Sequence, residues 1–237
     1  MLKTRNVQKF DGTMFSRRGA RAQGLLLLLA IFSASSLAMA GELTEQIKQT
    51  TDKILVIVQD PALKGTDKDV ERQQRMRKEI DERFDWADMA RSAYGMAWKD
   101  LNAVQRTEFT GLFGDLVNKN YMSKVDGYSG EKIQYKGEKV DGVYGVVDVV
   151  IVTLRNTDIP VTYRVLKKDS KWMIYDVVIE GVSMVNNYRS QIGAILNGSS
   201  YDDLVIRLKK NIAGNASKPE TKKLRTAPPA QTGEGML

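Results

Sequence analysis

The sequence predicts an α+β fold in which an antiparallel sheet of four strands lies between two sets of helices along the chain. Three observations support this. Apolar residues recur with the 3.6-residue period of a helix over much of 41–128. Over 131–181 they gather in segments rich in Val, Ile, Tyr and Thr, which are joined by short turns and therefore pair antiparallel. Over 183–213 the helical period returns.

The net charge of +7 is spread unevenly along the 237 residues. Residues 1–40 hold six Lys or Arg and one Asp, whereas residues 41–213 hold 26 basic and 26 acidic residues. Because a neutral body has no basic face that would release counterions, we expect no nucleic-acid partner. The hydrophobic content of 42% is enough for one domain with its own core, and we expect a monomer.

Residues 1–40 have the pattern of an export signal. Basic residues precede an apolar run from Leu25 to Phe32, and Ala38-Met39-Ala40 has the small-x-small form of a cleavage site. The run is shorter than the ~20 residues of a membrane span. Export of a chain without cysteine favours a bacterial periplasm over a disulfide-rich secreted module. We therefore expect cleavage near Ala40 and a periplasmic protein that begins at Gly41.

The chain contains neither His nor Cys. This removes Ser-His-Asp and Cys-His catalysis, the usual zinc sites and iron–sulfur ligation, and no Gly-rich phosphate loop follows a strand. We expect no metal and no cofactor. Only carboxylate, Lys, Tyr or Ser-Lys chemistry is left for an enzyme.

The helical part, 41–128, begins with an apolar stripe formed by Leu43, Ile47, Ile54 and Val58 in a helix that Pro61 ends. A second helix over about 69–83 is charged nearly throughout, which predicts a solvated surface element. A short helix then breaks near Gly95. Asn102 and Gln105 form a capping box that opens a strong helix reaching about 125.

The C-terminal helices span 183–213. Ser183 is placed to cap a helix that Gly198 closes, and Ser199 or Ser200 opens another that stops at Gly214. The segment 214–237 is poor in hydrophobic residues, and we expect it to be a disordered tail.

Four strands are predicted, near 132–139, 143–155, 161–168 and 171–180. A two-residue turn at Asp169-Ser170 sets Lys168 opposite Lys171, Val165 opposite Ile174 and Tyr163 opposite Asp176. A turn over 156–159 sets Val150 opposite Val165, Val152 opposite Tyr163 and Asp148 opposite Lys167. Charge pairing between Asp148 and Lys167 supports this second register.

With this register both faces of the sheet are apolar. Val150, Val152, Val161, Val165, Ile174 and Val178 share one face, and Val147, Val149, Ile151, Val177 and Ile179 share the other. Helices that cover both faces are one explanation. A cavity between the sheet and the helices is the alternative, because a single antiparallel sheet usually leaves one face in water.

Three stretches of sequence resemble the MlaC family of periplasmic toluene-tolerance proteins. They are MARSAYGMAWKDLNAVQRTEF, PVTYRVL and WMIYDVVIEGVSMVNNYRSQIGAIL, in this order after an export signal. The resemblance covers roughly 42–212. The block YDVVIEGVSMVNNYRS makes it specific, whereas the long basic leader and the tail are not part of the family pattern.

The resemblance implies a carrier of phospholipid, with a curved NTF2-like sheet and helices around a deep apolar pocket over 41–213. It implies that lipid passes between an outer-membrane lipoprotein complex and an inner-membrane ABC transporter complex with an MCE-domain protein. Such a carrier supports lipid asymmetry of the outer membrane. Phospholipid is then cargo, and the protein is not an enzyme.

The residues expected to line the lipid slot combine apolar sheet positions with aromatic residues of the helices. They are Trp98, Tyr121, Val150, Val152, Val161, Tyr163, Val165, Ile174, Val178, Val182 and Tyr188. Ordinary core packing is the alternative for Trp98, Tyr121 and Tyr188. Arg189 contacts either a phosphate headgroup or a partner, or it is a solvated charge.

Two other functions remain open. An NTF2-like enzyme would use Asp176 as a base beside Tyr163, although a cross-strand hydrogen bond between these two residues is the simpler interpretation. A periplasmic adaptor would have a filled core and no ligand.

Overall fold

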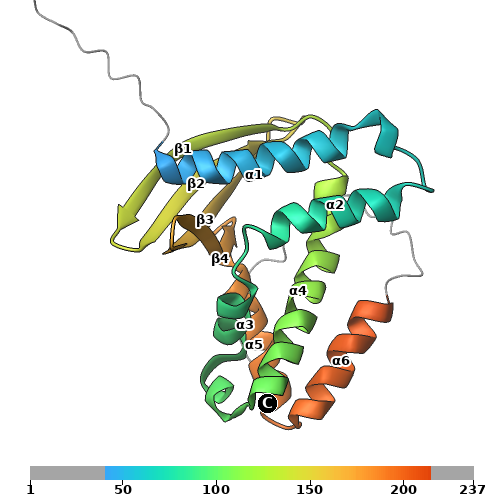
Figure 1. Ribbon diagram of the computed structural model, residues 1–237, viewed down its shortest axis with the longest axis vertical. Coiled ribbons are helices and arrows are strands. Elements are labelled where there is room, and N and C mark those ends of the chain that lie inside the picture. The colour runs from blue at the N-terminus through green and yellow to red at the C-terminus, as the bar shows by residue number, and fades with distance from the viewer. Residues whose placement is uncertain (1–40, 215–237) are drawn as a thin grey trace, which may run out of the picture. The chain divides into compact units, whose positions relative to one another are not determined.

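The computed structural model describes residues 41–214 (Figure 1). The predicted export signal lies outside the described residues, as does the predicted tail beyond Gly214. Among residues 41–214, no helix combines the length and the hydropathy that crossing a membrane requires.

Helices form the part of the chain before the sheet, as predicted. They are α1 (Glu42–Gln59), the 3-10 turn η1 (Pro61–Leu63), α2 (Asp69–Asp81), α3 (Trp86–Tyr94), the 3-10 turn η2 (Gly95–Asp100) and α4 (Ala103–Asp126). Gly95 ends α3 with φ +80°, a conformation that L side chains rarely adopt. The capping box is present, because Asn102 accepts from Gln105 N at 2.9 Å and Gln105 accepts from Asn102 N at 3.0 Å.

The prediction that α2 is a solvated surface element misses one buried residue. Met76 is fully buried and forms a small core with Val58 of α1 and Met122 of α4. Helix α2 has only three apolar residues, Val70, Met76 and Ile80, which are too few among its charged residues to give a clear period, so this contact was not predicted. The contact of Met76 places α2 against α1 and α4, and Figure 1 shows α2 running alongside α1.

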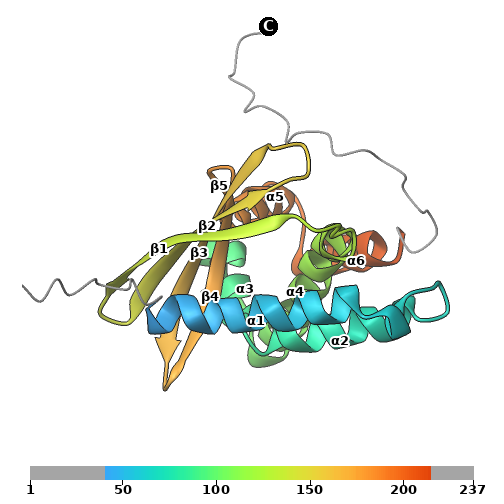
Figure 2. The same cartoon turned by 90° about the horizontal axis from the view of Figure 1, so that it is seen from above.

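The sheet is antiparallel with the strand order β1-β2-β3-β4-β5, and it is curved (Figure 2). Its strands are β1 (Lys132–Asp141), β2 (Tyr144–Val152), β3 (Asp158–Lys168), β4 (Lys171–Ile179) and β5 (Val182–Ser183). The α+β class and the four long strands are confirmed, and β5 adds a fifth strand of only two residues. Two helices follow, α5 (Met184–Leu196), which Ser183 caps, and α6 (Tyr201–Gly214).

The register between β3 and β4 is as predicted near the turn and differs beyond it. Val165 lies opposite Ile174, and Lys168 opposite Lys171. A β-bulge then leaves Tyr175 without a partner, so that Asp176 pairs with Arg164. The predicted pairing of Asp176 with Tyr163 is therefore wrong.

The predicted register between β2 and β3 is also wrong. Asp148 lies opposite Thr162, Val150 opposite Pro160 and Val152 opposite Asp158. The strand ends at Val152 because a tight loop follows, in which Thr153 N donates to Thr157 O at 3.0 Å and Asn156 N to Thr153 O at 2.9 Å. The predicted turn over 156–159 lies too late along the chain.

The shift in register exchanges the two faces of β2, because it amounts to an odd number of residues. Val147, Val149 and Ile151 now share a face with Val161, Val165 and Ile174 of β3 and β4. Apart from the buried Asp176, the residues of the opposite face are half-buried or exposed, namely Val146, Asp148, Val150, Val152, Pro160, Thr162, Arg164 and Val178. The prediction that Val150, Val152 and Val178 share a face with Val161 and Ile174 is wrong.

Helices pack on the face of the sheet that holds Val147 and Val165. Helix α1 contacts β1, β2 and β4, and it runs across the strands (Figure 2). Helices α3, α4 and α5 pack on one another beside the sheet, and α6 packs on α4 (Figure 1). We call this face of the sheet the helix-facing side.

Candidate functional site

The helix-facing side of the sheet is tightly packed at one end. Val165, Ile174 and Trp172 are at most 3% exposed there, and they belong to one core with Leu43 and Ile47 of α1. The backbone of Gly145 lets α1 approach, because a Cβ atom at this position would lie 2.7 Å from Leu43 Cδ2. We call this region, defined by Leu43, Ile47, Val165, Trp172 and Ile174, the filled end.

The other end of the same side is covered incompletely. Ile133, Ile151 and Ile159 form one cross-strand row there, and all three are half-buried. The next row holds Tyr135 and Ile179 at its two ends, again half-buried. The half-covered end is defined by Ile133, Tyr135, Ile151, Ile159, Tyr163 and Ile179.

Tyr163 is the residue of the half-covered end nearest to the centre of the sheet. It pairs with Val147 on β2 and Val177 on β4, both of which are buried. Loss of water around its hydroxyl raises the pKa of Tyr163 to about 12. Its side chain nevertheless keeps accessible surface, since it is only half-buried. A desolvated hydroxyl on a residue that keeps accessible surface is expected where a side chain borders a hollow deep in a protein.

The helices opposite the sheet supply further apolar and aromatic side chains. Tyr121 of α4 is half-buried and belongs to the same apolar cluster as the half-covered end, and burial raises its pKa. Tyr188 of α5 is buried in this cluster, and its hydroxyl accepts a hydrogen bond from Asn120 Nδ2 at 2.9 Å. This contact fixes α4 to α5.

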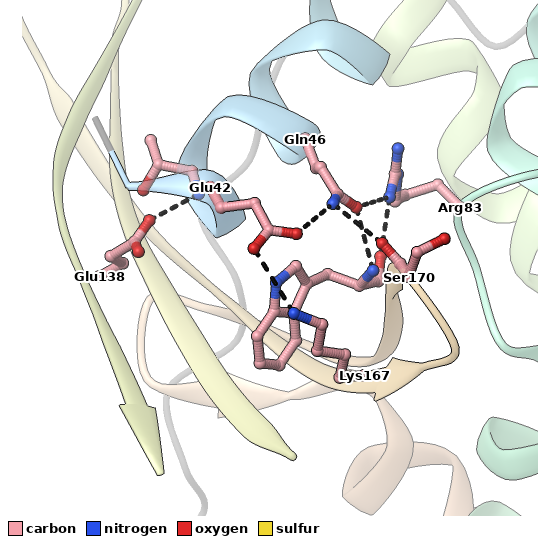
Figure 3. Close-up of polar contacts among 8 residues, drawn as sticks. Glu42, Gln46, Arg83, Glu138, Lys167 and Ser170 are labelled. Carbon is pink, nitrogen blue, oxygen red and sulfur yellow. Dashed lines mark hydrogen bonds and ion pairs between the residues drawn. The ribbon is translucent and has the colours of Figure 1, made fainter. Parts of the chain in front are cut away.

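Polar contacts hold the N-terminal half of α1 at the filled end (Figure 3). Gln46 is at their centre. Its Nε2 donates to Ser170 O at 3.2 Å, and its Oε1 accepts from Trp172 N and from Arg83 Nη1, both at 3.0 Å. Glu138 of β1 accepts from Thr44 N in the first turn of the helix at 2.6 Å.

Arg83 completes this attachment and covers the edge of β4. Its Nη1 donates to Trp172 O at 2.9 Å, and its Nε donates to Thr50 Oγ1 at 2.9 Å. The adjacent backbone pairs with Ile174, because Ile174 N donates to Arg83 O and Asp85 N donates to Ile174 O, both at 2.8 Å. The polar groups at this strand edge are thus satisfied within the chain, and α1 is held to β4 through the same arginine.

The expected slot residues fall into four groups. Val161, Val165, Ile174 and Tyr188 are buried in the main core, and Trp98, Tyr121 and Tyr163 are half-buried against it. Val150, Val152 and Val178 lie on the opposite side of the sheet. Val182 is 53% exposed on β5. Only the first two groups are brought together by the fold.

Trp98 belongs to an aromatic cluster below the sheet. Its ring lies edge-on to Tyr94 at 6.0 Å and to Phe109 at 6.1 Å, and the Arg106 guanidinium lies 5.8 Å from its centre. These contacts join η2 to α4. Arg189 is exposed on α5 and lies against Gly95, so it is available to a partner at the surface.

Asp176 is buried, and all of its described contacts are structural. Its Oδ2 accepts from Ser183 Oγ at 2.7 Å and from Arg164 Nη1 at 3.1 Å, and its Oδ1 accepts from Val185 N at 3.1 Å. A carboxylate in this position satisfies a free N–H at the start of α5. The geometry therefore gives Asp176 the role of a cap that ties α5 to the sheet.

Several residues of the half-covered end were missing from the predicted slot, namely Ile133, Tyr135, Ile151, Ile159 and Ile179. A signal for the first two was present, because Ile133-Gln134-Tyr135 alternates as a half-buried strand does. Ile151 and Ile179 had been assigned to the wrong face through the register.

A separate polar hollow of about 570 Å³ lies where the ends of α1 and α4 meet the start of α2. Arg72 lines it, and its guanidinium donates to Asp126 at 2.6 Å and 2.9 Å and to Asp69 at 2.8 Å. The hydrogen bond to Asp126 raises the pKa of Arg72 most, and the bond to Asp69 adds to this effect. Since the arginine is neutralised by two carboxylates, it joins helices and is not free to bind an anion.

Comparison with known proteins decides the family. The model of the MlaC protein family matches residues 48–210, which is more than half of the chain. The chain belongs to the MlaC family. A relative from Haemophilus influenzae, the intermembrane phospholipid transport system binding protein MlaC, is 30% identical over 130 residues, which are 53% of this chain and 59% of the relative.

The MlaC fold of the chain is also found in a solved structure. The phospholipid-binding protein of Ralstonia solanacearum, solved in complex with a phospholipid, superposes with a TM-score of 0.67 at 23% sequence identity. The match covers 74% of this chain and 99% of that protein. At this identity the likeness concerns the fold, and the predicted MlaC resemblance is confirmed by the family match.

Proposed function

We propose that this MlaC protein is a phospholipid carrier and that the acyl tails lie at the half-covered end of its sheet. The observation that carries the proposal is the row of Ile133, Ile151 and Ile159, which faces the helices and yet stays half-buried. Apolar side chains on the covered side of a sheet are normally packed to the density of a crystal. Incomplete cover on this side leaves apolar surface for hydrocarbon.

The energetics of tail binding favour a carrier that works by direct exchange. Two acyl tails have about 30 methylene groups, and their transfer from water is favourable by about 24 kcal/mol at ~0.8 kcal/mol each. This exceeds the ceiling of about 21 kcal/mol for ordinary affinities, so release into water would be extremely slow. Exchange with another apolar slot has a free-energy difference near zero. The carrier therefore needs docking partners.

We place this activity in the periplasm, on the basis of the basic and apolar pattern of residues 1–40. The proposed partners are an inner-membrane ABC transporter complex with an MCE-domain protein and an outer-membrane lipoprotein complex. Support for them comes from the family and from the name of the Haemophilus relative, of which the alignment covers 59%. Arg189, exposed on α5, is a candidate contact for either partner.

The test is lipid analysis of protein purified from the periplasm of an expressing bacterium. Organic extraction followed by mass spectrometry should recover about one phospholipid per chain. Ile151→Trp fills the half-covered end and should lower this yield at least tenfold. Val150→Trp, one residue away on the opposite side of the sheet, is the matched control and should retain the lipid.

Other outcomes of this experiment identify the alternatives. A folded protein that carries no lipid would contradict the carrier and favour an adaptor. Equal loss of lipid in Ile151→Trp and Val150→Trp would place the tails elsewhere. An enzyme that uses Asp176 has little support from the geometry, because the carboxylate is occupied by Ser183, Arg164 and the start of α5.

A further inference from the structure

Two tyrosines extend from the sheet into the apolar surroundings of the half-covered end. Tyr135 comes from β1, where it pairs with Val149, and Tyr163 comes from β3, where it pairs with Val147. Both lie on the helix-facing side and both are half-buried. Phenylalanine would fill the same positions without a polar atom, so the two hydroxyls require an explanation.

The hydroxyl oxygen of Tyr135 is buried and has no hydrogen-bond partner among the described residues. The Thr51 side chain of α1 interacts with the Tyr135 hydroxyl and lowers its pKa, but this contact does not reach the distance and angle of a hydrogen bond, and the Thr51 hydroxyl donates to the Ile47 carbonyl at 3.1 Å. Desolvation dominates and raises the pKa of Tyr135. The phenol is therefore a buried O–H donor that the described chain leaves unused.

The Tyr163 hydroxyl is desolvated as well. The raised pKa of its hydroxyl has two causes, loss of water and the nearby Tyr135, and no hydrogen bond contributes to it. Its neighbours on the sheet are Val147, Val177 and, in the next row, Val149 and Val161. None of these side chains can accept a hydrogen bond.

An unpaired buried hydroxyl such as that of Tyr135 has a free-energy cost, because it has lost its hydrogen bonds to water, and the Tyr163 hydroxyl in the same apolar region is desolvated as well. The cost disappears if the ligand supplies the acceptors. In a diacyl phospholipid the oxygen atoms nearest to the tails are the ester carbonyls, and the tails themselves have none. A phenolic O–H is a suitable donor to a carbonyl oxygen.

We propose that Tyr135 and Tyr163 donate hydrogen bonds to ester carbonyl oxygens of the bound lipid and so select acyl-ester lipids over ether-linked ones. The inference rests on the proposed carrier function, because it assumes that lipid occupies the half-covered end. It assigns to the two tyrosines a role in specificity that the surrounding aliphatic side chains, which bind any hydrocarbon, do not have.

The test compares two lipids that differ only in the linkage. Full-length protein is loaded from vesicles that contain equal amounts of diacyl phosphatidylethanolamine and its diether analogue with the same chain length. Mass spectrometry then measures the ratio of the two bound lipids. Each hydrogen bond of about 1 kcal/mol contributes a factor of about five, so the two tyrosines together predict a ratio of about 30 in favour of the ester.

Variants assign this preference to the tyrosines. In the double variant Tyr135→Phe/Tyr163→Phe the ratio should fall to about one, because the ether lipid loses nothing and the ester loses its donors. Tyr144→Phe is the matched control, since Tyr144 is exposed at 56% and pairs with Leu166 at the far end of β2. It should keep the ratio of the unchanged protein.

Each result has a distinct meaning. A ratio near one in the unchanged protein overturns the inference without any variant, so a misfolded double variant does not remove the test. A ratio that is unchanged in the double variant overturns it as well. If the unchanged protein takes up neither lipid, the proposed carrier function fails together with the inference.

Discussion

The two ends of the helix-facing side of the sheet have similar amino acids and different environments. At the filled end Val165 and Ile174 are buried under Leu43 and Ile47, and a polar network centred on Gln46 holds α1 in place. At the half-covered end Ile133, Ile151 and Ile159 are only half-buried. The difference suggests that one end of the sheet stabilises the fold and the other end binds the cargo.

The attachment of α1 follows the same division. Its N-terminal half is tied to β1, β4 and the turn between β3 and β4, whereas its C-terminal half is joined to α2 by the Lys53–Glu79 ion pair. The N-terminal half is thus fixed to the sheet, whereas the C-terminal half, which includes Val58, packs on α2 and α4. We therefore expect lipid to change the environment of the C-terminal half of α1 more than that of the N-terminal half.

The largest effect that separates the two ends is on stability. Ile174→Ala at the filled end should lower the free energy of unfolding by about 2–5 kcal/mol, because it leaves a cavity in a packed core. Ile151→Ala at the half-covered end should cost lipid-free protein clearly less, since fewer contacts are lost. Denaturant unfolding of both variants measures this, and equal losses would remove the distinction between the ends.

The second effect is on the pH dependence of stability. Because the pKa of Tyr163 is raised to about 12 in the folded protein, from about 10 in the unfolded chain, its contribution is complete below pH 10 and is lost as pH rises to about 12. The loss is on the order of 2 kcal/mol. Tyr163→Phe should remove this part of the decline, which unfolding curves between pH 9 and 12 would reveal. A decline that is identical in the two proteins would show that the Tyr163 hydroxyl is not desolvated.

A smaller effect is expected at the attachment of α1. Gln46→Ala removes the acceptor for Trp172 N and one acceptor for Arg83, and it should lower the free energy of unfolding by about 1–2 kcal/mol. Gln49→Ala is the control, because within residues 41–214 the Gln49 side chain forms a hydrogen bond only with Glu45, which is exposed on the same helix. Hydrogen exchange should also become faster in the N-terminal half of α1 in the first variant alone. Equal stability of the two variants would mean that the network in Figure 3 does not hold the helix.

Features that depend on neighbouring residues were predictable from the sequence. The capping box at Asn102 and Gln105, the cap at Ser183, the break at Gly95 and the turn at Asp169-Ser170 all involve residues within a few positions of one another. The α+β class and the MlaC resemblance followed from the order of the elements and from the block before and within α5. Local chemistry is sufficient for such features.

The position of the slot was predicted less well, because it depends on register. Both faces of the strands are apolar, so hydrophobicity gave no reason to prefer one register, and the Asp148–Lys167 pairing that favoured the chosen one does not form. The loop closed by Thr153 and Thr157 and the bulge at Tyr175 each exchange the faces of a strand. The expected wall therefore combined Val161 and Ile174 with Val152 and Val178 of the opposite side.

The most direct test of the account is photo-crosslinking with a phospholipid that carries a diazirine in its acyl chain. Protein loaded with this lipid is irradiated and digested, and mass spectrometry locates the modified residues. The account predicts adducts on the strand residues of the half-covered end, such as Ile133, Ile151 and Ile159. Adducts confined to Val150, Val152 and Val178 would put the tails on the opposite side of the sheet and contradict it.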